Sequence, residues 1–347
     1  MISTPSTPKS IGIRKFLLLW PLFFLICGGL GYPSLSRFDP RAIEGLRDTI
    51  KYSAITTGDD QSGFRENMRC RVLVPYVARP FYWFAQGRLR SWNPVFFGLL
   101  VAASIFCATT ACLIVSIGMR VFGDLNLGLL GALLYLLNFA VSNLQLAGMV
   151  DAGEACFMAA VVWSLLNDKW WLLALWALFG AAAKETFVPF AGAFALTWWF
   201  VGYRRKETSL KELFWIIALA AIGLGTVLGI RVAVVGQFRW PWQIAEQVIG
   251  RDSYFSAIRK FFTEGSFWYV LGWLLPLGLV RIKAFPKTWV FAALAASVVA
   301  LVLGVEIDSG GNVARALFNI SGPLLSLSVA RLISGKSSSL QPATQNQ

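Results

Sequence analysis

Two acidic residues that follow the first apolar segment are candidates for a catalytic base. Asp39 stands directly before Pro40, and Asp48 lies further along the same polar segment. The chain has no His, so acid–base chemistry must come from a carboxylate, a Lys or a Tyr. Asp39 could also cap a helix that begins at Pro40, a role compatible with catalysis. Asp48 could instead be the reactive group, because helical spacing places Tyr52 one turn away.

Three arginines in the same segment have side chains suited to binding a phosphate group: Arg69, Arg71 and Arg79. A guanidinium group binds phosphate through two parallel hydrogen bonds. The arginines could alternatively lie at a membrane surface, with apolar stems buried and charged ends in water. We favour phosphate binding, because the topology derived below places them on the outer side, where basic residues are disfavoured.

A second acidic pair lies in the sequence "MVDAGEACF". Asp151 and Glu154 are three positions apart, so they would share one face of a helix. Negative charge at a helix N-terminus is favourable, and we prefer that role for Glu154. For Asp151 the helix-terminus role and a role in a polar substrate or metal site both stay open.

Lys184 and Glu185 interrupt one of the most apolar parts of the chain, "GAAAKETFVPFAG" at 180–192. The two charges are expected to mark a tight turn between two helices at the membrane surface. A plain turn more often uses Gly, Asn or Ser. An ammonium group beside its own carboxylate could also bind an anionic ligand without a large net charge.

The last polar segment before the C-terminal apolar run is "VEIDSGGNVARALFNISGP". Asp308 precedes two glycines whose backbone N–H groups would lie near a helix N-terminus, a position that attracts phosphate. Arg315 lies about one turn into an apolar helix, where an unpaired charge is costly. Its side chain therefore either reaches outward or pairs with an anion, and both residues are candidate substrate-binding groups.

The composition places these charges in a membrane protein. Hydrophobic residues make up 56% of the 347 residues and charged residues 14%, against about 25% charged in soluble proteins. The net charge is +13, but the basic residues lie mainly between apolar runs. We interpret them as topology signals and phospholipid contacts, and we expect no nucleic-acid partner. Five cysteines without a C-x-x-C pair support neither a disulfide framework nor a zinc site.

Ten apolar segments are long enough, or nearly long enough, to cross a bilayer. They fall near 15–32, 94–118, 125–147, 150–167, 170–183, 186–202, 213–235, 266–280, 288–304 and 316–334. We therefore predict an all-α fold, with a single transmembrane helix bundle over 1–334 that has about ten spans. A disordered cytoplasmic tail is expected over 335–347.

The basic residues predict the orientation of this bundle. Lys9, Arg14 and Lys15 favour a cytoplasmic N-terminus. Counting through ten spans then places the basic loops 203–212 and 281–287 in the cytoplasm, together with the C-terminus. The segments 33–93, 148–155, 184–185, 236–265 and 306–315 fall on the outer side. All the candidate site residues therefore lie on one face of a multi-pass inner-membrane protein.

The outer segment 33–93 is too long for a passive connection. Its stretch "VLVPYVARPFYWFAQ" is aromatic and amphipathic, and two prolines argue against a plain spanning helix. We expect helices that lie in the membrane interface, with Tyr76, Tyr82 and Trp83 at the level of the headgroups.

These features together resemble the GT-C superfamily of polytopic membrane glycosyltransferases. The likeness rests on an early Asp39 in a long outer loop, an "AKE" turn with Lys184 and Glu185, and a late Arg315 in "NVARALFNISGP". The stretch "CRVLVPYVARP" at 70–80 is also similar to an R-x-L-x-P-x-x-A run in bacterial membrane proteins related to this group.

The resemblance implies that Asp39 is the general base and that Lys184 and Arg315 hold the phosphate of a polyprenyl-phosphate-linked sugar. The expected reaction is inverting transfer of that sugar to an acceptor at the extracytoplasmic face. The sequence indicates neither the sugar nor the acceptor. It requires no cofactor; a divalent metal is compatible with this chemistry, although no ligand spacing demands one.

Two other functions stay open. A transporter or flippase of an anionic lipid or glycan would need ionisable groups near the bilayer midplane and broken helices. Arg231 is the main charge within an apolar run, and its place near the outer end disfavours transport. A non-catalytic membrane subunit of a polysaccharide assembly system would use the outer loops as contact surfaces.

Overall fold

A computed structural model describes residues 13–36, 47–59, 61, 63–89, 92–240, 243, 254–263, 265–307 and 313–335. Every regular element within these residues is a helix, so the all-α prediction is confirmed for this part of the chain. The predicted site residues Asp39 and Asp308 lie outside the described residues, as does the predicted tail from 336 onward.

Four helices are long and apolar enough to cross a membrane: α5 (Pro94–Phe122), α11 (Leu210–Val235), α16 (Lys287–Ile307) and α17 (Val313–Ile333). A fifth candidate is the bent pair formed by α6 (Leu125–Leu136) and the stretch Phe139–Ala147, which contains α7 (Phe139–Asn143) and η1 (Gln145–Ala147). The described chain therefore has four or five candidate spans by length and composition, and about ten spans stays a prediction.

The other helices are shorter or less apolar. They are α1 (Ile13–Ser36), α2 (Arg47–Thr57), α3 (Glu66–Arg69), α4 (Leu73–Ala85), α8 (Asp151–Leu166), α9 (Leu172–Ala183), α10 (Phe187–Arg204), α13 (Tyr254–Thr263), α14 (Gly265–Leu271), α15 (Leu274–Val280) and η2 (Ile282–Ala284). The segment predicted to form interface helices thus folds as α2, α3 and α4.

Polar side chains set where several long helices begin. Asn93 precedes Pro94 and accepts hydrogen bonds from the first backbone N–H groups of α5. Asp124 does the same for α6. Ser209 and Glu212 form a capping box at the start of α11. These caps satisfy donors that the helices themselves leave free.

Small residues let neighbouring helices approach closely. A Cβ atom on Gly128 of α6 would lie 2.8 Å from the carbonyl oxygen of Val115 in α5, and one on Gly118 would lie 2.6 Å from the Cα of Gly128. A Cβ on Gly98 would similarly meet the backbone of Ala78 in α4 at 2.7 Å. Close packing of this kind holds apolar helices together in a membrane. The hydrophobic effect does not do so there, because lipid tails are as apolar as the helix surfaces.

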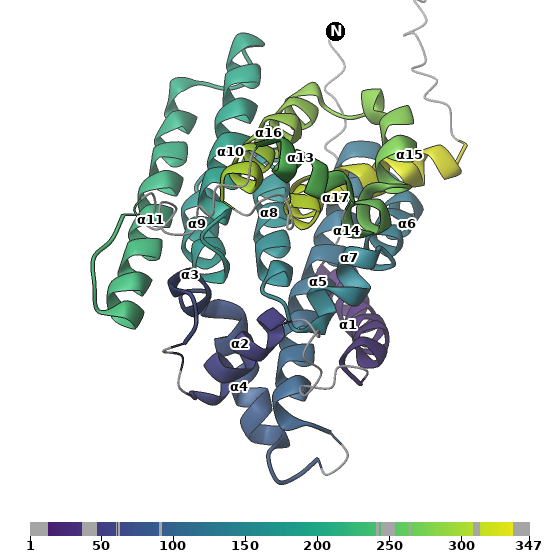
Figure 1. Cartoon of the computed structure of the whole chain (residues 1–347). Coiled ribbons are helices and arrows are strands. Elements are labelled where there is room, and N and C mark those ends of the chain that lie inside the picture. Colours follow the sequence, from purple (N-terminus) through teal and green to yellow (C-terminus); the bar gives the residue numbers. More distant parts are fainter. Residues whose placement is uncertain are drawn as a thin grey trace, which may run out of the picture.

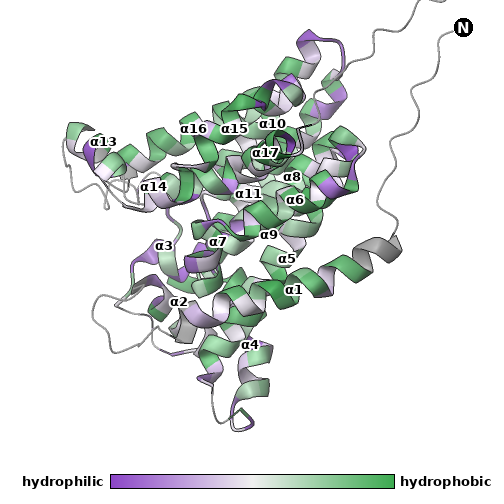
Figure 2. Ribbon diagram, turned by 90° about the vertical axis from the view of Figure 1, so that its right-hand side faces the viewer, coloured by the Kyte–Doolittle hydropathy of each residue, from purple (hydrophilic) through white to green (hydrophobic). Residues whose placement is uncertain are grey.

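The helix α8 lies in the middle of the protein and is buried along nearly its whole length, in contact with α5, α9, α10 and α17 (Figure 1). The helices α2, α3 and α4 lie together at one end (Figure 1). Figure 2 shows hydrophobic residues over most of the helices, with hydrophilic residues at the ends of the molecule, among them those around α2 and α3. The end formed by α2 and α3 contains the charged side chains described next.

Candidate functional site: a buried ionic network

Lys184 and Glu185 lie in the short break between α9 and α10, as the sequence predicts. Their side chains point into the protein instead of into solvent. The Nζ atom of Lys184 lies 2.8 Å from Oδ1 of Asp151 and 3.1 Å from Oε2 of Glu154, and its side chain is 11% exposed. Lys184 is therefore a largely buried cation bound by two carboxylates of α8. The residues between α9 and α10 do not form a solvated turn.

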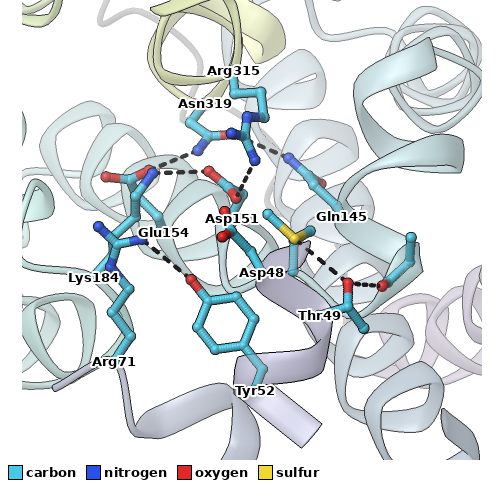
Figure 3. A network of polar contacts seen from close by, with 12 residues as sticks. Asp48, Thr49, Tyr52, Arg71, Gln145, Asp151, Glu154, Lys184, Arg315 and Asn319 are labelled. Atoms are coloured by element: carbon cyan, nitrogen blue, oxygen red, sulfur yellow. Dashed lines mark hydrogen bonds and ion pairs between the residues drawn. The ribbon is translucent and has the colours of Figure 1, made fainter. Parts of the chain in front are cut away.

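Arg315 reaches the same carboxylate from α17. Its Nη1 atom lies 3.6 Å from Oδ2 of Asp151, so Asp151 lies between two cations, Lys184 and Arg315 (Figure 3). One turn further along α17, the amide of Asn319 donates to Oε2 of Glu154 at 2.8 Å. Residues from α8, α17 and the α9–α10 break therefore meet at one place.

Arg71 and Glu185 form a second ion pair beside the first. The guanidinium of Arg71 donates two hydrogen bonds to the Glu185 carboxylate, at 2.9 and 2.6 Å. A third N–H group of Arg71 donates to the hydroxyl of Tyr52 on α2 at 3.2 Å. The paired geometry is the strong, orientation-specific form of an Arg–carboxylate contact.

The protonation states of Glu185 and Tyr52, the two partners of Arg71, follow from burial and from neighbouring charge. Burial alone would raise the pKa of Glu185, but the charge and hydrogen bonds of Arg71 outweigh burial and lower it. Burial raises the pKa of Tyr52, and Arg71 offsets only part of that effect. At neutral pH Glu185 is therefore an anion, and Tyr52 keeps its proton.

Three cations and three carboxylates make up the ionic network: Arg71, Lys184, Arg315, Asp151, Glu154 and Glu185. Their formal charges sum to zero. A buried charge is tolerated only when it is paired and its remaining hydrogen-bonding groups are satisfied. The polar residues Tyr52, Thr186 and Asn319 supply such further hydrogen bonds.

Three of the predicted site residues lie outside the ionic network. Arg69 donates to the backbone carbonyl of Val234 at 3.1 Å. Arg79 donates to the carbonyl of Ile55 at 2.8 Å and covers the ring of Tyr76, 4.3 Å from its centroid. The third, Asp48, shares α2 with Tyr52 (Figure 3) and forms an ion pair of 3.0 Å with Lys51 of the same helix.

The sequence analysis did not identify Gln145 and Asn319 as members of the site, and it gave Glu154 only a helix-terminus role. Glu154 does lie in the first turn of α8, but it is fully buried and binds Lys184, Thr186 and Asn319. Gln145 donates to Asn319 at 3.0 Å. The signal for Asn319 was its place one helical turn after Arg315, on the same face of an apolar helix.

No cluster of three or more His, Cys, Asp or Glu suited to a metal ion occurs among the described residues. The acidic groups of the network are instead bound to cations. A metal ion bound at the carboxylates of the ionic network would have to displace those cations. The ionic network therefore offers no prepared site for the divalent metal considered from the sequence.

The fold and the site define an α-helical protein with several helices able to cross a membrane and a buried ionic network at one end. Comparison of the chain with protein-family models gives no match, and comparison with curated proteins gives none either. The function is therefore argued from the site and from the motifs of the sequence.

Proposed function

We propose that the protein is a GT-C-like inner-membrane glycosyltransferase with about ten spans and both termini in the cytoplasm. It transfers a sugar from a polyprenyl-phosphate donor to an acceptor at the extracytoplasmic face. The observation that carries the proposal is the meeting of Lys184 and Arg315 at Asp151. These two cations are distant in sequence, and the resemblance assigns both of them to the lipid phosphate.

Arg315 is the group best placed to take the phosphate. Its contact with Asp151, at 3.6 Å, is longer than a hydrogen bond, and its side chain is 16% exposed. Lys184 is held more firmly by two carboxylates. An arriving phosphate can therefore bind the guanidinium of Arg315 while Lys184 continues to neutralise Asp151. Both cations then stabilise the charge that develops on the departing lipid phosphate.

The reaction also needs a base. The acceptor hydroxyl gives its proton to a carboxylate while its oxygen bonds to the anomeric carbon, and the bond from that carbon to the lipid phosphate breaks. Asp39 is the base that the resemblance implies. Asp48 is the alternative, on the helix that brings Tyr52 to the ionic network (Figure 3). A positioned general base contributes about 10²–10⁴ in rate.

A deletion strain complemented with variants tests the proposal. Arg315→Gln, Asp39→Asn and Asp48→Asn are compared with Arg205→Gln, which removes an exposed arginine from the α10–α11 connection. Surface glycans and lipid-linked sugars are profiled by mass spectrometry. We expect deletion to remove one glycan modification, Arg205→Gln to restore it, and Arg315→Gln together with one of the two Asp variants to fail.

The same profiles separate the competing functions. Full restoration by both Asp variants would exclude a catalytic carboxylate at these positions. Accumulation of a lipid-linked sugar on the inner leaflet alone would indicate a transporter or flippase. Loss of a whole polymer, with every point variant active, would indicate a non-catalytic assembly subunit.

A further inference from the structure

Arg231 is a buried cation that the ionic network does not use. It lies in the last turns of α11 and is 4% exposed. Its Nε and Nη1 atoms have no hydrogen-bond partner among the residues that the structure describes. A guanidinium group is always charged, and burying it without a partner is strongly unfavourable. An anion bound beside Arg231 would remove this energetic cost.

Two carboxylates share the surroundings of Cys70 with Arg231, and both are paired with other cations. Glu185 is held by the paired hydrogen bonds of Arg71. Glu66 of α3 forms an ion pair of 3.1 Å with Arg239. Neither carboxylate forms an ion pair with Arg231.

The thiol of Cys70 also lies within range of the charge of Arg231, but it does not supply the anion. Burial raises the pKa of Cys70 to about 11, although Arg231 and Arg69 act in the opposite direction. The thiol is therefore protonated and neutral at physiological pH. The described residues therefore place no anion against the Nε and Nη1 atoms of Arg231, and an anion from outside the described chain could bind there.

A second arginine faces the same junction of α3 and α11. Arg69 donates through Nη2 to the carbonyl of Val234, in the final turn of α11, and its Nε atom is buried without a partner among the described residues. An open cavity of about 350 Å³ adjoins it, with Arg69, Tyr76 and Val234 in its walls together with Asp59, an exposed carboxylate that accepts a hydrogen bond from Thr57. Arg69 thus lines a space that could admit a ligand, and Arg231 stands one helical turn before Val234, which lines the same space from α11.

We propose that Arg231 and Arg69 form a binding site for a phosphate group, carried by a membrane lipid or free in solution. Arginine forks suit phosphate oxygens, and their positive charge favours an anionic group. A lipid can reach the site because α11 is a candidate span with only 22% of its apolar window buried. Its exposed side chains include Phe214, Ile217 and, beside Arg231, Val232. This site is independent of the proposed glycosyltransferase activity.

Thermal unfolding of the full chain in detergent tests the site. The added probes are phosphatidylglycerol, diacylglycerol with the same acyl chains, and inorganic phosphate. The variants are Arg231→Gln and the control Arg205→Gln, with Arg231→Lys in case the Gln variant does not fold. At roughly 100-fold excess over Kd, we expect phosphatidylglycerol to raise Tm by about 5 °C in the wild type and the control. We expect a much smaller rise in both Arg231 variants.

The probes distinguish the two sources of phosphate. A rise with phosphatidylglycerol alone assigns the site to a lipid headgroup, and an equal rise with inorganic phosphate assigns it to a free phosphate. An equal rise with diacylglycerol would overturn the proposal, because that lipid carries no phosphate. A rise that persists in the Arg231 variants, or no rise with any probe, would overturn it as well.

Discussion

At the scale of single residues, the Arg71–Glu185 pair depends on both partners. Arg71→Met leaves the Glu185 carboxylate partly buried without its cation, and we expect the free energy of unfolding to fall by about 3 kcal/mol. The double variant Arg71→Met with Glu185→Met removes both charges and should recover most of that loss. Denaturation of the purified variants in detergent measures both values. Equal stability of the double variant and Arg71→Met would contradict this account.

The same pair predicts how stability depends on pH. Arg71 holds the pKa of folded Glu185 below its ordinary value of 4.5. The carboxylate therefore contributes stability that is fully present above pH 4.5 and is lost as the pH falls through the folded-state pKa. We expect the wild-type Tm to fall more steeply below pH 4.5 than the Tm of Glu185→Gln. Parallel pH profiles for the two proteins would show that the pair does not set the acid response.

Several members of the ionic network could be recognised from the sequence because they are charged residues next to apolar runs. Lys184, Glu185 and Arg315 stand out for this reason alone. The sequence did not indicate which residues pair with one another. Lys184 meets Asp151 across thirty-three positions of the chain and Asn319 meets Glu154 across 165, so only the packing of the helices pairs them.

At the scale of helices, close approach at glycine gives a prediction with a matched control. Gly128→Ala places a methyl group 2.8 Å from the backbone of α5, where no flexible side chain can move aside. We expect a loss of about 1–3 kcal/mol in stability from the forced shift of α6. Gly225→Ala on α11 meets no atom within 4 Å and should be neutral, or stabilising by up to about 1 kcal/mol. Detergent denaturation of both variants checks the difference, and equal effects would refute it.

The sequence predicted helix boundaries correctly where a capping residue marks them. The prediction was wrong where tertiary contacts break a helix. Asn93 and Pro94 fix the start of α5 at the predicted position. The segment predicted as continuous over 125–147 bends by 45° instead. Asn138 caps α7 there and donates to the carbonyl of Val270 at 2.9 Å, a partner from a distant helix. Apolar periodicity alone contains no signal for that contact.

At the scale of the whole molecule, the ionic network explains how apolar helices can be held in one register. Its charges come from α8, α17, the α9–α10 break and the segment that joins α3 to α4. Each element supplies a charge that is costly to bury alone, so each is stabilised only when the others are in place. The polar end near α2 and α3 is thereby tied to the apolar interior.

The proposed topology gives a prediction for the whole protein. Figure 1 shows the α10–α11 connection at the end opposite to α4. Basic residues favour a cytoplasmic position for that connection, so Glu207→Cys should react with a membrane-impermeant thiol reagent only from the cytoplasmic side. Gln86→Cys, at the end of α4, should react only from outside. Both positions are exposed, whereas all five native cysteines are buried and give a low background. Labelling of both variants from the same side would refute the topology and, with it, an extracytoplasmic position for the ionic network.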